Sequence, residues 1–307
     1  MTKARENSDY TGLQAEIVAG DTAARAGRKN LIINGAMQVS QRGDYTTAIS
    51  SWTNGAYLMD RFLSYVNGVT ATFQDMSGSV KYTATSTTSG YLGTEQRIED
   101  YARLANKVIT ISAEVKSNSS SARLMIYNTA YIDGTTHTGG GGWETLTATI
   151  TLSGLTRLWY QVWIASSAGG SVSITSGDYI EVRNIQLEEG SVATDFEHRS
   201  YGEELQLCQR YYEQSYTQLT GSDGKFSAVA STGSNYLQGP TFRVTKRAQP
   251  TMVAHDNIGE MDGSGSNLTA GAFGHIGLNN ALRLALGGTG RIDGQVYRYH
   301  WTADAEL

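Results

Sequence analysis

The chain has 307 residues, with 35 glycines, 2 prolines, one cysteine, 17% charged residues and a formal net charge of −5. This length allows two packed domains, one cysteine excludes an internal disulfide framework, and the absence of a Lys or Arg stripe argues against binding to nucleic acid. No stretch approaches the roughly 20 apolar residues of a membrane span, so we expect no membrane insertion.

Residues 1–29 are polar and contain too few large apolar side chains to build a core. We expect an N-terminal arm that a partner orders through its apolar anchor, Leu13, Ile17 and Val18; an ordinary frayed terminus is the alternative. The opening MTKARENSDYTG has no apolar segment that could act as a signal peptide. We therefore expect synthesis in a reducing compartment, without use of the Sec route.

From Asn30 the pattern changes to short runs in which apolar and polar residues alternate. Ile109 to Val115 and Leu146 to Leu152 both have the period of two that is typical of half-buried antiparallel strands. Glycine-rich and serine-rich turns, such as Gly139 to Gly142, separate these runs. The pattern predicts an all-β fold, with a jelly-roll β-sandwich over residues 30–200.

The segment YIEVRNIQLEE changes phase between Val182 and Ile185, which predicts a β-bulge near Asn184. The segment GEELQLCQRYYEQSY that follows has helical spacing and predicts a short helical connector over residues 201–216. Strands resume beyond it, in FRVTKR, RLALGG and VYRYHW. We therefore expect a smaller C-terminal β domain over residues 217–307.

Several of these segments resemble a known family. NLIINGAMQVSQRG with DRF at Asp60 resembles the opening strand of CenC-type carbohydrate-binding modules, and IEVRNIQLEEG resembles their closing strand. QRIEDYARLANKVITISAEVKSNSS is similar to their middle. The sequence also resembles tail fibre and receptor-binding proteins of tailed bacteriophages, in which an MTKAR-like start, the LEEGSVATDFEHRSYGEELQLCQRYYE-like junction and a TADAEL tail occur together.

The resemblance covers nearly the whole chain, and its motifs are structural. It implies a homotrimer in the virion tail, made in the host cytoplasm, with the arm attached to phage tail or baseplate proteins. We therefore expect a non-enzymatic structural virion component that recognises a host cell-surface glycan or protein receptor. The alternatives are a virion-associated polysaccharide depolymerase and a stand-alone carbohydrate-binding module. The chain departs from the family at Ala36 and Met37, where many such modules place an acidic calcium ligand, which speaks against a structural calcium.

The only cysteine lies on an apolar stripe of the predicted connector helix, Leu205, Cys208 and Tyr212. A catalytic cysteine needs a lowered pKa and a nearby base, whereas the preceding Glu203 and Glu204 would raise this pKa. We interpret Cys208 as a small buried hydrophobe. In a trimer, we expect the stripe to pack around the three-fold axis.

The other candidates for chemistry are weak. Four acids near the junction could supply the two carboxylates of a glycosidase: Glu188, Glu189, Asp195 and Glu197. Adjacent residues of a strand point to opposite faces, so we interpret these acids as solvated. The histidines show no metal-ligand spacing; they are His137, His198, His255, His275 and His300. DGSGSN at Asp262 begins like a calcium loop, but Phe273 stands where the bidentate glutamate belongs. We expect no catalytic residue, metal or cofactor.

The most suggestive apolar feature is LWYQVWI, which places Trp159, Gln161 and Trp163 on one side of a strand and its aliphatic residues on the other. Packing of the tryptophans against another subunit or domain is favoured over a platform for sugar rings and over burial within the module. The loop 255–268 and the turns near Gly233 and Gly287 are further candidates for contact with a ligand, because they are rich in glycine and expected to be exposed. The candidate ligand-binding residues are Trp143, Trp159, Trp163, Tyr236, Asp256 and Asn257.

Overall fold

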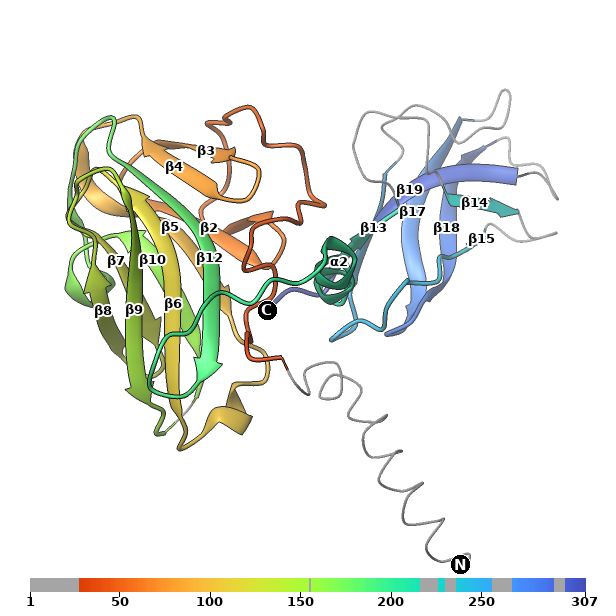
Figure 1. The fold of residues 1–307 in the computed structure, drawn as a ribbon. Coiled ribbons are helices and arrows are strands. Elements are labelled where there is room, and N and C mark those ends of the chain that lie inside the picture. Colours follow the sequence, from red (N-terminus) through yellow and green to blue (C-terminus); the bar gives the residue numbers. More distant parts are fainter. Residues whose placement is uncertain (1–27, 155, 216–225, 230–235, 256–266, 290–295) are drawn as a thin grey trace, which may run out of the picture.

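A computed structural model describes residues 28–154, 156–215, 226–229, 236–255, 267–289 and 296–307. Within these ranges, two antiparallel sheets packed face to face form a first body (Figure 1). The first sheet has the order β1-β2-β5-β10-β7-β8, with β11 paired to β5, and seven strands are described in it. They are β1 (Ala56–Met59), β2 (Phe62–Asn67), β5 (Thr88–Arg97), β7 (Ala122–Tyr127), β8 (Tyr131–Thr136), β10 (Trp159–Ile164) and β11 (Val172–Ile174).

The second sheet has the order β3-β4-β12-β6-β9. Its described strands are β3 (Ala71–Asp75), β4 (Val80–Ala84), β6 (Val108–Ser117), β9 (Trp143–Thr151) and β12 (Tyr179–Glu189). Alternate apolar side chains of both sheets fill the space between them, among them Ile111, Leu124, Val162 and Val182, all 0% exposed. Full burial of one such side chain stabilises the fold by about 1.5–3 kcal/mol. The chain is thus nearly all β, and its first body is a β-sandwich of the jelly-roll type, as the alternation predicts.

The strands predicted from alternation are confirmed. The apolar residues of Ile109 to Val115 are fully buried in β6, which pairs with β9 along its length. The predicted bulge is also present, because the register of β12 against β6 shifts between Arg183 and Gln186, and Asn184 has a φ of +49°. The shift lets apolar side chains on both sides of the bulge face the same core.

The predicted opening strand is wrong. Residues 30–43 contain no strand, although Leu31 donates its N–H to Leu187 O at 2.8 Å and Gly35 O accepts from Ile185 N at 2.9 Å, so the segment runs beside β12. Asn34, at a φ of +62°, turns the chain away: its side chain donates to Val39 O at 2.8 Å and accepts from the N–H of Val39 at 2.9 Å. These local hydrogen bonds replace a strand ladder.

Two short 3₁₀ helices, η1 (Tyr101–Leu104) and η2 (Ser167–Gly169), lie within the sandwich, and α2 (Tyr201–Gln209) follows it. Ser200 caps α2 by accepting the N–H of Glu203. Of the described helices, none has the length and apolar character needed to cross a membrane. The predicted helix up to Tyr216 is wrong beyond Gln209, because residues 212–214 pair with the last strand of the chain instead.

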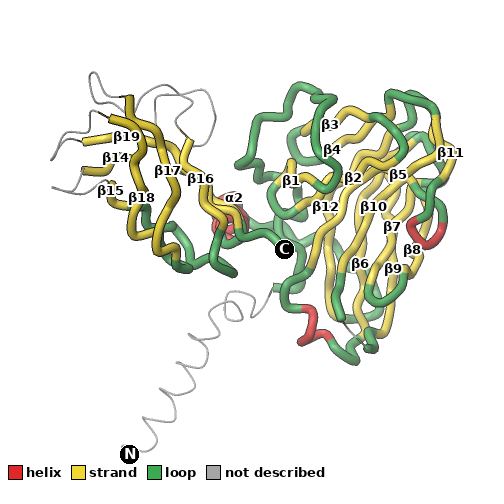
Figure 2. The backbone as a smooth tube through the Cα atoms, turned by 180° about the vertical axis from the view of Figure 1, so that it is seen from behind, coloured by secondary structure: helices red, strands yellow, loops and turns green. Residues whose placement is uncertain are grey.

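A second body follows α2 and is seen from behind in Figure 2. In its described part, one sheet has the order β13-β19-β14 with β16 paired to β19, and the other has the order β15-β18-β17. The strands are β13 (Tyr212–Gln214), β14 (Phe226–Val229), β15 (Tyr236–Gln238), β16 (Thr251–His255), β17 (Asn267–Ile276), β18 (Ala281–Thr289) and β19 (Val296–Asp304). The predictions for RLALGG and VYRYHW are confirmed in β18 and β19.

The predicted strand FRVTKR is wrong. Residues 242–247 form no strand, since the N–H groups of Phe242 and Lys246 bond to the turn at residues 278–279. The ammonium group of Lys246 is buried and reaches Glu213 in β13 and the carbonyl oxygen of Gln209 at 2.5 Å. A buried charge needs such partners, and they hold this segment against the connector.

Candidate functional site

Strand β10 divides its side chains between the core and the outer face of the seven-stranded sheet. Tyr160, Val162 and Ile164 point into the core, whereas Trp159, Gln161 and Trp163 point outward. Strand β10 pairs with β5 on one side and with β7 on the other. Outward side chains of β2, β5, β7 and β8 therefore surround the two tryptophans.

Trp163 is packed beneath two tyrosines and is 3% exposed. Its ring stacks on Tyr91 at 4.8 Å with an interplanar angle of 5°, and its centroid lies 5.3 Å from that of Tyr65. Gly93 lies opposite Trp163 in the register and has a φ of +151°. A Cβ at Gly93 would clash with the backbone oxygen of Val162 and would stand 2.7 Å from Trp163 Cδ1, so glycine provides the space for both the neighbouring backbone and this ring.

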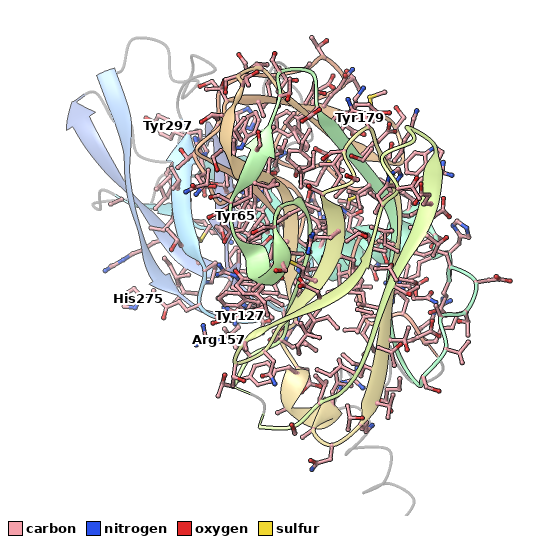
Figure 3. All side chains as sticks on the ribbon, turned by 90° about the vertical axis from the view of Figure 1, so that its left-hand side faces the viewer. Tyr65, Tyr127, Arg157, Tyr179, His275 and Tyr297 are labelled. Carbon is pink, nitrogen blue, oxygen red and sulfur yellow. The ribbon has the colours of Figure 1, made fainter. Side chains whose placement is uncertain are left out.

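A row of half-buried rings continues across the same face. The centroid of Trp159 lies 5.2 Å from that of Tyr127, and Tyr127 lies 4.7 Å from Tyr131 of the edge strand β8. Figure 3 labels Tyr65 and Tyr127 on this side of the molecule. The aromatic row consists of five partly exposed residues: Tyr65, Tyr91, Tyr127, Tyr131 and Trp159.

Polar side chains lie beside the aromatic row. Gln161 donates from Nε2 to Glu95 Oε2 at 2.9 Å, and Arg97 donates from Nε to Glu95 Oε1 at 3.0 Å. Burial raises the pKa of Glu95, although both donors favour its ionised form. Arg97 also donates to the hydroxyl of Tyr65 at 3.2 Å, which links the polar group to the ring next to it.

Three buried polar atoms on this face make no hydrogen bond with any described residue. They are Oε1 of Gln161, in a side chain that is 0% exposed, Nε1 of Trp163 and Nε of Arg123. An unpaired buried donor or acceptor costs about 1–3 kcal/mol, so each atom favours a hydroxyl or a water as its partner. The face thus combines partly exposed aromatic rings with polar atoms that are buried beneath them.

This arrangement has chemical groups that sugar-binding surfaces use. Aromatic faces offer rigid apolar area on which the C–H side of a sugar ring packs, while amide, carboxyl and hydroxyl groups bond to its hydroxyls. Among described residues of this face, Glu95 is bonded to Gln161 and Arg97, and Asp133 lies 3.7 Å from Arg123. Throughout the described ranges, no three His, Cys, Asp or Glu side chains come together as metal ligands.

The other predicted ligand-binding residues lie elsewhere. Trp143 is in β9 of the five-stranded sheet, where it lines a groove of about 760 Å³ and lies 4.0 Å from the guanidinium of Arg183. Tyr236 begins β15 in the second body. Asp256, Asn257 and the arm residues Leu13, Ile17 and Val18 lie outside the described residues.

The connector stripe is buried within the chain itself. Cys208 is 0% exposed and packs with Ile33 and Val39 of the sandwich, and Tyr212 is 7% exposed. Burial and then the neighbouring carboxylates raise the pKa of Cys208 far above its usual range, so the thiol stays neutral. Packing around a three-fold axis is wrong for Cys208 and Tyr212, because the chain already covers them. Leu205 stays half-buried beside them.

The acids of the junction have structural partners. Glu188 is 4% exposed and accepts the N–H and the hydroxyl of Thr194 at 2.9 and 2.7 Å. Burial opposes these hydrogen bonds, but the pKa of Glu188 is lowered overall. Glu189 points the other way to Lys107 at 2.8 Å, which confirms that the two adjacent acids do not share a site.

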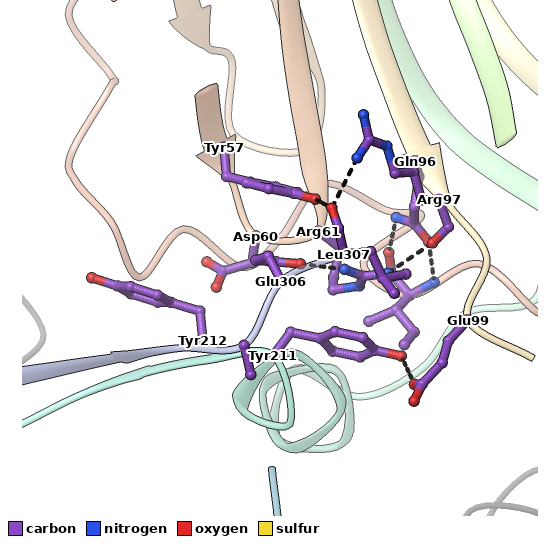
Figure 4. Close-up of polar contacts among 12 residues, drawn as sticks. Tyr57, Asp60, Arg61, Gln96, Arg97, Glu99, Tyr211, Tyr212, Glu306 and Leu307 are labelled. Carbon is purple, nitrogen blue, oxygen red and sulfur yellow. Dashed lines mark hydrogen bonds and ion pairs between the residues drawn. The ribbon is translucent and has the colours of Figure 1, made fainter. Parts of the chain in front are cut away.

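A buried polar seam joins the second body to the sandwich (Figure 4). Glu306 pairs with Arg61, and the guanidinium of Arg61 lies 3.5 Å from the ring centre of Tyr211. Arg97 donates to the carbonyl oxygen of Leu307 at 2.9 Å. Arg97 therefore contacts both the seam and the candidate binding face.

A scan against protein-family models finds no match, and a search of curated proteins finds none. Among solved structures, the chain is similar to the CBM22-1 xylan-binding domain of Xyn10C from Paenibacillus barcinonensis, at 14% identity and a TM-score of 0.29 over 50% of this chain and 100% of that chain. The structure of TmCBM61 in complex with β-1,4-galactotriose is similar at 12% identity and a TM-score of 0.31, over 53% of this chain and 99% of that chain. The enzymatically active domain of tailspike protein 4 of bacteriophage CBA120 is similar at 10% identity and a TM-score of 0.32, over 52% of this chain and 21% of that chain. Each likeness is low in identity and TM-score and concerns the fold alone.

Proposed function

We propose that this chain is a non-enzymatic receptor-binding protein of a bacteriophage tail, which binds a host cell-surface glycan on the outer face of the seven-stranded sheet. Glycan binding is carried by one observation: the aromatic row lies beside buried, unpartnered polar atoms of Gln161 and Trp163. The place in a tail is supported by the sequence resemblance, in which arm, sandwich, connector and second β region follow in this order.

In this proposal the chain forms a homotrimer whose arms attach to tail or baseplate proteins. Three linked sites that engage one surface together gain about 10² to 10⁴ in avidity over a single site. A half-buried aromatic row is suited to such a weak individual site. Light scattering after size exclusion tests the assembly: we expect three times the mass of the chain, whereas a monomer would favour a stand-alone carbohydrate-binding module.

The glycan site is tested on an array of purified bacterial surface polysaccharides. We expect Trp159→Ala to weaken binding of the full chain about tenfold or more, as loss of a central aromatic contact usually does. Trp143→Ala, on the other sheet, is the matched control and should bind as the wild type does. Equal binding by Trp159→Ala and the wild type, or loss only in Trp143→Ala, would contradict the proposed face.

The non-enzymatic part of the proposal has its own test. A polysaccharide that the chain binds is incubated with it, and new reducing ends are measured over time. We expect no release above a buffer control. A sustained release would instead support a polysaccharide depolymerase. Its catalytic carboxylates would then have to be residues other than Glu95 and Asp133, which lie against arginines.

A further inference from the structure

The aromatic row ends beside two guanidinium groups. Trp159 has two guanidinium groups near its ring, with Cζ of Arg97 at 4.5 Å and Cζ of Arg157 at 5.1 Å from the ring centre. Arg157 also lies 5.8 Å from the centre of the Tyr127 ring, and Figure 3 labels both residues near one another. One exposed cation therefore reaches across the two rings that close this end of the row.

The two guanidinium groups differ in their partners. Arg97 is neutralised by Glu95 at 3.0 Å and is held by the carbonyl oxygen of Leu307. Arg157 is exposed and forms neither an ion pair nor a hydrogen bond with the part of the chain that the structure describes. The next cation on the face, Arg123, lies 3.7 Å from Asp133. Arg157 thus leaves a net positive end on a chain whose formal charge is −5.

A guanidinium held beside aromatic rings has a distinct preference for ligands. Its planar set of donors matches the two oxygens of a carboxylate or a phosphate, and such charge-assisted bonds are about twice as strong as neutral ones. The rings restrict where Arg157 lies, through cation–π contacts. A sugar ring on the aromatic row would carry its substituents toward this cation.

We propose that the ligand of this face is an acidic glycan, whose sugar rings lie along the aromatic row and whose anionic substituent, a carboxylate or a phosphate, binds Arg157. This inference rests on the proposed function, because it requires glycan binding at this face. It adds the chemical class of the ligand and assigns to Arg157 the selection between acidic and neutral glycans.

The experiment uses the full chain and acidic bacterial surface polysaccharides in matched forms. Each polysaccharide is measured untreated, after carbodiimide-mediated reduction of its carboxyl groups to alcohols, and after removal of phosphate groups. We expect one of the two treatments to weaken binding about tenfold or more, and which treatment does so identifies the anion. Binding should also weaken with added salt, since the contact is at the surface.

Variants assign the effect to Arg157. Arg157→Gln should weaken binding of the untreated polysaccharide by the same factor as removal of the charged groups, and should leave the residual binding of the treated form unchanged. Arg157→Lys, which keeps the charge, should retain part of the affinity. Lys81→Gln is the matched control, because Lys81 also lies over a ring, 4.5 Å from the centre of Tyr179, but on the other sheet.

The outcomes separate the two proposals. Strong binding that survives removal of both carboxyl and phosphate groups would overturn the acidic-glycan inference and leave the proposed function in place. The acidic-glycan inference would also be overturned if Arg157→Gln weakened binding to the treated and untreated polysaccharides equally, and the proposed function would again remain in place. Failure of the wild type to bind any polysaccharide, acidic or neutral, would instead contradict the proposed function itself.

Discussion

Replacing Glu306 by Gln should destabilise the seam between the two bodies. The side chains of Glu306 and Arg61 are 5% and 2% exposed and form an ion pair, and Arg42 lies 3.2 Å from the same carboxylate. The substitution leaves Arg61 buried against a neutral amide. Breaking a buried pair from one side costs about 3–5 kcal/mol, and we expect the lower end because the amide oxygen still accepts a hydrogen bond.

Scanning calorimetry measures this cost. A loss of about 3 kcal/mol should lower the melting temperature by about 6–12 °C, at about 2–4 °C per kcal/mol for a unit of this size. Glu189→Gln is the control, since Glu189 and Lys107 form an ion pair in which both side chains are more than 40% exposed. Such pairs contribute about 0–1 kcal/mol. Equal shifts for the two variants would refute the reasoning.

Three further predictions concern single positions. Gly93→Ala should displace Trp163, cost about 1–3 kcal/mol in urea unfolding and change the near-ultraviolet circular dichroism, whereas Gly142→Ala, in open space, should do neither. Burial raises the pKa of Asp60 to about 6, so its stabilising contribution is complete below about pH 4 and is lost as the pH rises through 6. Over that range, the unfolding free energy of the wild type relative to Asp60→Asn should fall by about 3 kcal/mol. A difference that does not change with pH would contradict this. Native Cys208 should not react with a thiol reagent until the chain unfolds, so rapid labelling of the folded protein would exclude its burial.

Local patterns predict the sandwich well. The alternation at Ile109 to Val115 and the phase change near Asn184 each follow from side-chain direction in a single strand, and β6 and the bulge of β12 confirm them. The errors occur where distant partners decide. Helix α2 ends early because residues 212–214 pair with β19, more than 80 positions away, and a buried contact to Glu213 holds Lys246 out of a strand.

The candidate site could be predicted only in part. The alternation of β10 placed Trp159 and Trp163 on its outer side, but no local pattern says which strands lie beside it. Tyr65 and Tyr91 were therefore missed, although each alternates with core residues in its own strand. The glycine opposite Trp163 was the available signal, since a small residue in a strand often marks the close approach of a large neighbour.

The seam could not be foreseen from the sequence, because it joins residues separated by more than 200 positions. The seam also bears on the proposed binding face, since Arg97 contacts Leu307, Glu95 and the ring of Trp159. The second body therefore helps to hold one polar member of the face in place. A rigidly held group loses little conformational freedom on binding, which favours affinity.

The central claim is that the outer face of the seven-stranded sheet binds a glycan, and a crystal structure of the full chain with a bound oligosaccharide tests it most directly. The oligosaccharide is cut from whichever polysaccharide binds on the array. We predict sugar rings packed on the partly exposed rings of the aromatic row. Sugar density in the groove beside Trp143, or on the second body alone, would contradict the claim.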